Sequence, residues 1–126
     1  MNRITSITIA GKQYPLNFSI RAAKKTVERY GDLSEVSKAL IGLNEKYNPV
    51  DETVWMLGIM LEEGARYARL TDGADITPPG GEDLETLVGY YDVELREKLM
   101  TAMFGGMETE IETEEDPKNA KPTQSK

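Results

Sequence analysis

Carboxylates are the most numerous side chains in this chain that could carry out acid–base chemistry. Its 126 residues include 22 aspartates and glutamates but no histidine and no cysteine. Histidine is the most frequent proton-transfer residue in enzymes, and cysteine is an intrinsically strong nucleophile. No serine lies in the Gly-x-Ser-x-Gly setting of an activated nucleophile. A catalytic site built from carboxylates alone therefore stays open.

Two pairs of adjacent glutamates are the first candidates for such a site, Glu62-Glu63 and Glu114-Glu115. Neighbouring residues on a helix point about 100° apart, so an adjacent pair does not converge on one substrate. Runs of charged residues are usually solvated. We expect both pairs to lie on the surface, and we expect the protein not to be an enzyme.

Two glycine-containing loops share part of a ligand-binding pattern. Asp72-Gly73-Ala74-Asp75 has the acidic start of a calcium loop but lacks its alternating acids and its distal glutamate. Gly80-Gly81 is not followed by the Lys-Ser/Thr of a phosphate loop. The missing cysteines also exclude a thiolate metal site. We expect no metal ion and no cofactor.

Charge is unevenly distributed along the chain. The net charge is −7, but residues 1–30 hold six basic groups and one acid, which gives 6 − 1 = +5 and leaves −7 − 5 = −12 for the rest. An acidic body argues against nucleic acid as the main partner, because phosphate binding gains from Lys and Arg. One expected helix carries four of the basic groups: Arg21, Lys24, Lys25 and Arg29. These four form a solvated face, a nucleic-acid patch or a docking face for the acidic end of the chain.

A methionine-rich segment is the candidate partner-binding surface. Its four large apolar residues lie close together in the sequence, near the end of the expected globular part: Met100, Met103, Phe104 and Met107. Methionine is adaptable and frequent at binding surfaces that accept several partners. The alternative is ordinary core packing, since apolar residues at helical spacing usually lie in a core.

The elements that position these residues begin with a β-hairpin over residues 3–19. Apolar side chains alternate on both sides of Gly11-Lys12, which suits a two-residue type II′ turn. That turn would pair Ile9 with Tyr14, Ile7 with Leu16 and Thr5 with Phe18, all on one face.

Helices are expected over residues 20–30, 33–43, 49–70, 82–91 and 92–104. Ser19 and Asn48 are candidate N-caps, and Gly31 is a candidate C-cap. The first helix has an apolar stripe of Ile20, Ala23, Val27 and Tyr30, and the second a stripe of Leu33, Val36, Leu40 and Leu43. The third is apolar nearly all round, which is typical of a central helix.

Two glycines interrupt that third helix, and residues beyond it are mostly polar. Gly58 and Gly64 indicate either close packing or a bend, since each weakens a helix by roughly 1 kcal/mol relative to Ala. Residues 71–81 are a loop by composition. Residues 108–126 contain six acids before Pro117 and few apolar residues, so we expect a disordered tail. The chain is thus an α+β protein with one domain over residues 1–107.

Targeting signals are also not evident in the sequence. The chain does not begin with a basic segment, an apolar run and a cleavage site. No stretch approaches the roughly 20 apolar residues that span a bilayer. We therefore expect a cytoplasmic protein that has no membrane partner.

The first third of the chain, residues 4–43, resembles a known family. The similarity lies in Ile7-x-Ile9-x-Gly11-Lys12-x-Tyr14-Pro15-Leu16-x-Phe18, then Ala22-Ala23, then Tyr30-Gly31-Asp32-Leu33. This pattern resembles the tail assembly chaperones of long-tailed bacteriophages and prophages, in which such a hairpin precedes several helices. A similar hairpin also begins other phage tail and packaging proteins.

The resemblance implies a role in virion assembly within the cytoplasm of a bacterial host. Such chaperones bind the tape measure protein, keep it soluble and help to recruit the tail tube protein. The resemblance fixes no individual site residues. A structural tail or head–tail connector component that stays in the virion is an alternative, and a small nucleic-acid-binding regulator is another. Homo-oligomers are common among such proteins, and the sequence leaves this point open.

Overall fold

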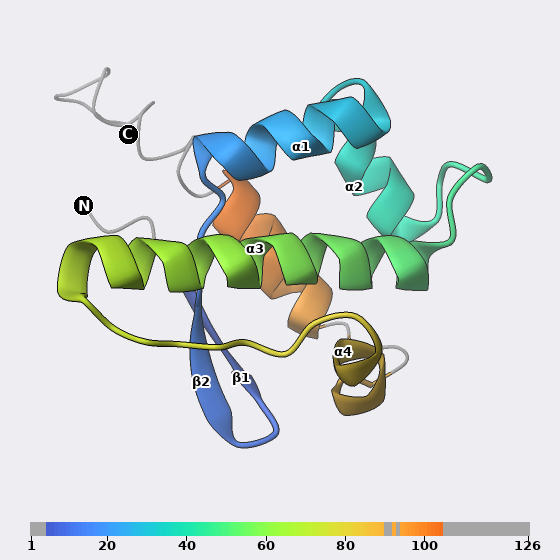
Figure 1. Ribbon diagram of the computed structural model, residues 1–126. Helices are drawn as coiled ribbons and strands as arrows, with labels where there is room; N and C mark the ends of the chain where they lie inside the picture. The colour runs from blue at the N-terminus through green and yellow to red at the C-terminus, as the bar shows by residue number, and fades with distance from the viewer. Residues whose placement is uncertain (1–4, 90–91, 93, 105–126) are drawn as a thin grey trace, which may run out of the picture.

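A two-stranded hairpin packs on a mainly helical body, which confirms the predicted α+β class (Figure 1). The computed structural model describes residues 5–89, 92 and 94–104. The predicted tail over residues 108–126 lies outside this part. The elements are β1 (Thr5–Ile9), β2 (Lys12–Leu16), α1 (Ile20–Tyr30), α2 (Ser34–Ile41), α3 (Pro49–Asp72) and α4 (Glu82–Leu87), followed by helical residues 94–104.

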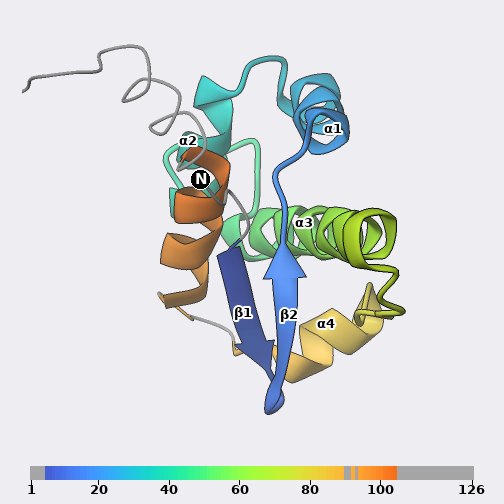
Figure 2. The ribbon, with the colours of Figure 1, turned by 90° about the vertical axis from the view of Figure 1, so that its left-hand side faces the viewer.

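The long helix α3 runs through the middle of the molecule. It begins at Pro49, where the Asn48 side chain accepts hydrogen bonds from the N–H groups of Val50 and Asp51. It ends at Gly73, which has a φ of 70°. In both ribbon views α1 and α2 lie on one side of α3, whereas α4 and the hairpin turn lie on the other (Figures 1 and 2). The prediction of a central third helix is confirmed. The helix extends through Asp72, so its predicted end at residue 70 and the assignment of Thr71 and Asp72 to the loop are wrong.

The hairpin has the predicted face but not the predicted register. Ile7 pairs with Tyr14 and Ile9 with Lys12, so the pairing is shifted by two residues from the expected one. The turn residues are Ala10 and Gly11, with φ values of 53° and 81°. Positive φ at both positions defines a type I′ turn, whose twist matches that of the strands. The predicted type II′ turn at Gly11-Lys12 and the pairs Ile9–Tyr14, Ile7–Leu16 and Thr5–Phe18 are therefore wrong.

A shift of two residues preserves the alternation of faces, and this explains why the hydrophobic pattern was compatible with both registers. Ile7, Ile9, Tyr14 and Leu16 are all buried in the core. Phe18 follows the end of β2 and packs partly buried against that core.

Strand β2 approaches the backbone of α3 very closely. A Cβ atom added at Gly64 would lie 2.0 Å from the carbonyl oxygen of Pro15. The Asn17 N–H donates a hydrogen bond of 3.2 Å to the Met60 carbonyl of α3. Of the two interpretations of the helix glycines, close packing is thus the correct one for Gly64.

Helix α1 has the boundaries predicted for it, whereas α2 differs from its prediction at both ends. Ser19 caps α1 through a hydrogen bond from the Ala22 N–H, and Gly31 ends it with a φ of 87°. Helix α2 is shorter than predicted, because Gly42 ends it with a φ of 84°. Leu43 consequently lies outside the helix and is 71% exposed, so its assignment to the apolar stripe is wrong.

The last helices are also shorter than predicted. Helix α4 ends at Leu87, since Val88 has extended backbone with a ψ of 139°. The helix predicted over residues 92–104 is helical over residues 94–104. Both contribute to the core through Leu84, Leu95, Leu99, Ala102 and Met103. Within the described residues, no helix is both long enough and apolar enough to cross a membrane.

Candidate functional site

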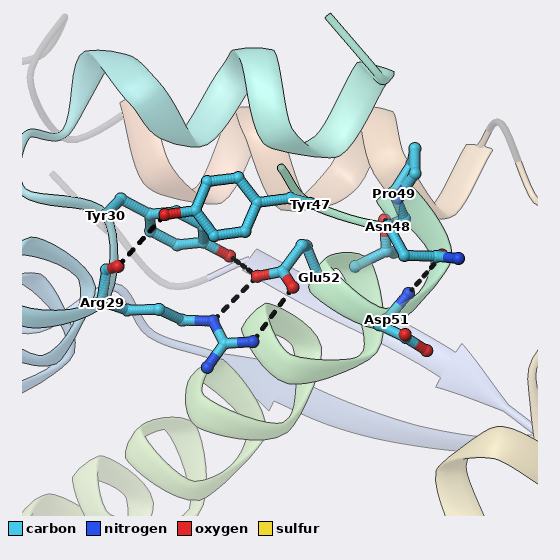
Figure 3. A network of polar contacts seen from close by, with 8 residues as sticks. Arg29, Tyr30, Tyr47, Asn48, Pro49, Asp51 and Glu52 are labelled. Atoms are coloured by element: carbon cyan, nitrogen blue, oxygen red, sulfur yellow. Dashed lines mark hydrogen bonds and ion pairs between the residues drawn. The ribbon is translucent and has the colours of Figure 1, made fainter. Parts of the chain in front are cut away.

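A buried carboxylate joins one end of α1 to the start of α3 (Figure 3). Glu52 is only 4% exposed. Its two oxygens accept hydrogen bonds from Arg29, at 2.8 Å from Nε and 3.0 Å from Nη2. Tyr30 donates a further hydrogen bond of 2.5 Å. The Arg29 guanidinium also lies 4.6 Å from the ring centre of Trp55, which suits a cation–π contact. We call Glu52, Arg29 and Tyr30 the Glu52 cluster.

A second buried carboxylate holds the other end of α1. Glu63 is 5% exposed and accepts a hydrogen bond of 2.6 Å from the Ser19 hydroxyl. Arg21 donates to its other oxygen at 3.2 Å, and Arg66 lies 3.7 Å from the same oxygen. We call these four residues the Glu63 cluster. Glu52 and Glu63 are about three helical turns apart on α3, so together they hold both ends of α1.

These clusters correct two predictions. Glu62 is exposed as expected, but Glu63 is buried, and the expectation that the pair is solvated is wrong for it. Glu114-Glu115 lies outside the described residues. Arg21 and Arg29 are ion-paired to α3, so only Lys24 and Lys25 remain of the proposed basic face. The sequence signal was the presence of two arginines eight residues apart on one helix, Arg21 and Arg29, and of two glutamates eleven residues apart on another.

The protonation of these carboxylates argues for a structural role. Burial raises the pKa of Glu52, but hydrogen bonds from Arg29 and Tyr30 and the charge of Arg29 outweigh it, so its pKa lies below the usual 4.5. The pKa of Glu63 is lowered in the same way by Ser19, Arg21 and Arg66 against the effect of burial. Burial and the hydrogen bond to Glu52 raise the pKa of Tyr30. Because both carboxylates are charged and hydrogen-bonded at neutral pH, they are poor proton acceptors.

The two clusters leave the apolar stripe of α1 facing outward. The buried residues of this helix are Ala22, Thr26 and Tyr30. Ile20 is 78% exposed and Val27 is 42% exposed. The predicted burial of the stripe is therefore wrong for Ile20 and Val27, whereas Ala23 is half-buried and Tyr30 is buried as expected. Polar pairing with α3 decides the rotation of α1 here.

A second candidate surface is an open groove between α3 and α4. It has a volume of about 450 Å³ and an apolar floor that includes Val54, Trp55 and Leu84. Its rim carries three exposed carboxylates: Asp51, Glu62 and Glu85. Among the described residues that line the groove, Arg29 is the one cationic group, and it is already paired with Glu52. We call this the α3–α4 groove. It offers apolar contact area surrounded by negative charge.

The methionine-rich segment lies against the core where the structure describes it. Met103 is 2% exposed and belongs to the core cluster. Met100 and Phe104 are partly buried and pack against the same cluster. Met107 lies outside the described residues. A partner-binding role for these four residues stays a prediction.

Comparisons with protein-family models, with curated proteins and with solved structures return no match for this chain.

Proposed function

We propose that this protein is a non-enzymatic tail assembly chaperone that binds the tape measure protein of a long-tailed phage or prophage. The proposal draws its class of function from the hairpin motif that resembles this family. The observation that carries it physically is the α3–α4 groove, which combines an apolar floor with a rim of exposed carboxylates. The proposed site of action is the cytoplasm of the bacterial host, before the tail is complete.

The groove suits a helical client. An amphipathic helix can lay its apolar face into a groove of this kind, and its flanking residues then determine specificity. Trp55 supplies a large apolar contact that is already oriented by Arg29 and Tyr30. The exposed carboxylates Asp51, Glu62 and Glu85 favour a client whose apolar stripe is flanked by Lys or Arg. A long helical tape measure protein would offer many such segments.

Co-expression with the tape measure protein encoded in the same genome tests the proposal. We expect the chaperone to move most of that protein into the soluble fraction and to co-purify with it. The double variant Asp51→Lys/Glu62→Lys should lose this effect, because it reverses charge at the groove rim. The matched control Glu45→Lys/Asp75→Lys changes two exposed acids outside the groove and should retain it.

Two outcomes would contradict the proposal. One is a tape measure protein that aggregates equally with and without this chain. The other is stoichiometric presence of this chain in purified virions, measured by mass spectrometry, which would instead favour a structural tail or connector component.

A further inference from the structure

The outward face of α1 combines apolar and cationic side chains. Ile20, Ala23 and Val27 form a continuous stripe, which we call the α1 stripe, and Ile20 is 78% exposed. Lys24 and Lys25 are exposed on the same helix, and neither forms an ion pair within the described residues. An apolar strip with a polar rim marks an interaction surface more often than scattered apolar residues do.

The orientation of this face is fixed from behind. The Glu52 and Glu63 clusters hold the two ends of α1 on α3. Rotating the helix to bury Ile20 would break the ion pairs of Arg29 with Glu52 and of Arg21 with Glu63. Glu52 would then be a buried carboxylate without its cation, which is strongly unfavourable. The α1 stripe is thus held on the outward side of α1, where another segment can cover it.

The chain beyond Phe104 has the complementary composition. Met107 and Ile111 are spaced so that they would share one face of a helix or lie on one side of an extended segment. They are surrounded by acids, six of them over residues 108–116. An apolar pair flanked by carboxylates matches an apolar stripe flanked by lysines.

The segment beyond Phe104 also begins on the same side of α3 as α1. In both ribbon views, residues 94–104 end on the side of α3 where α1 lies (Figures 1 and 2). An extended chain spans about 3.3–3.6 Å per residue, so Met107 can lie up to about 10 Å from Phe104 and Ile111 up to about 24 Å. Helix α1 is itself about 16 Å long. The reach of Ile111 thus exceeds the length of the helix, so the segment through Ile111 is long enough to extend along α1.

We propose that residues 107–116 of the same chain cover the α1 stripe, with Met107 and Ile111 against Ile20 and Val27 and the acids beside Lys24 and Lys25. The segment then shields an apolar face of the free protein, and any partner that binds α1 must displace it. This inference concerns a different surface from the α3–α4 groove and does not depend on the proposed function.

Disulfide trapping in the full-length chain tests this contact. The protein contains no cysteine, so two introduced thiols are the only ones present. Cysteine behaves as a small hydrophobic residue, which makes Val27→Cys/Ile111→Cys a mild change. The matched control Glu28→Cys/Ile111→Cys places the first thiol on the neighbouring exposed residue, which points about 100° away around α1.

We expect the monomer with the Val27 thiol to form its internal disulfide at least about tenfold faster than the control, because docking raises the effective concentration of the two thiols. Adding Lys24→Glu and Lys25→Glu, or raising the salt to about 1 M, should remove most of that difference. Equal rates for the two positions would overturn the proposal, as would a rate that does not respond to either charge reversal or salt. A disulfide-linked dimer as the main product would also overturn it, since a second copy would then be the occupant.

Discussion

Strand β2 and helix α1 both lie against α3, but they are held there by different forces. Strand β2 meets the backbone of α3 directly at Gly64 and buries Leu16 completely. Helix α1 is held by side chains that reach the two buried glutamates of α3, Glu52 and Glu63. The buried surface of α1 is small, with Ala22 and Thr26 at its centre.

The difference shows how a helix can be fixed without burying its most apolar side. Close backbone approach requires a glycine and leaves no space for a neighbouring side chain, so it allows only one position for the strand. Ion pairs between long side chains fix the ends of a helix and let charge pairing decide which face turns inward. Strand β2 is therefore part of the core, whereas α1 carries its apolar stripe to the surface.

The largest expected effect comes from the backbone contact. Gly64→Ala places a Cβ 2.0 Å from the Pro15 carbonyl oxygen, so strand and helix must separate. We expect a loss of about 3 kcal/mol in the free energy of unfolding, measured by urea denaturation, because overpacking of this kind forces backbone shifts. Gly58→Ala is the matched control, since its Cβ would meet only Leu84 Cδ1 at 3.6 Å. That control should gain up to about 1 kcal/mol from helix propensity, and similar losses in both variants would contradict the prediction.

The ion-paired contact should be weaker but still substantial. Glu52→Gln removes the charge that pairs with Arg29 and the best acceptor for Tyr30. Because the Arg29 side chain is 36% exposed and can be partly hydrated, we expect a loss of about 2 kcal/mol, below that of a fully buried pair. Glu62→Gln on the exposed side of α3 is the control and should change stability by less than about 0.5 kcal/mol. Equal effects of the two variants would show that the Glu52 cluster does not hold α1.

These two contacts differ in how far the sequence could predict them. Alternation on both sides of Gly11 was enough to predict the hairpin and its buried face, because that face survives a slip of two residues. The register needed the twist of the turn, which the positive φ values of Ala10 and Gly11 reveal. Gly64 stood out as a candidate for close packing, but nothing local to it identifies Pro15 as the group that approaches.

The rotation of α1 could not be predicted from its own residues. Hydrophobicity alone predicts that Ile20 and Val27 face the core. It gives no reason to bury Ala22 and Thr26 in their place. The structure reverses this order because Glu52 and Glu63 are buried partners on another helix, far along the chain. The same property limited the prediction of the candidate sites. The α3–α4 groove joins residues from three helices. Of its three rim acids, only Glu62 belongs to a pair of adjacent glutamates that the sequence alone identifies.

Acid should weaken the α1 contact before it affects the β2 contact. The pKa of Glu52 and the pKa of Glu63 both lie below the usual 4.5 in the folded protein. Their contribution to stability is therefore complete above about pH 4.5 and is lost as the pH falls through the lowered folded values. We expect the free energy of unfolding to decrease below that pH. In the double variant Glu52→Gln/Glu63→Gln, it should decrease less steeply with falling pH. The same decrease with pH in both proteins would mean that other carboxylates cause the loss of stability in acid.

The smallest expected effect lies on the outward side of α1. Burying a whole isoleucine side chain contributes about 1.5–3 kcal/mol, but Ile20 is 78% exposed, so Ile20→Ser should lower the free energy of unfolding by less than about 1 kcal/mol. Leu40→Ala in the completely buried part of α2 is the comparison, with an expected loss of about 2–5 kcal/mol. A loss from Ile20→Ser as large as that from Leu40→Ala would mean that Ile20 packs in the core and is not merely covered by residues 107–116. The ion pairs at Glu52 and Glu63 could then not be what sets the rotation of α1.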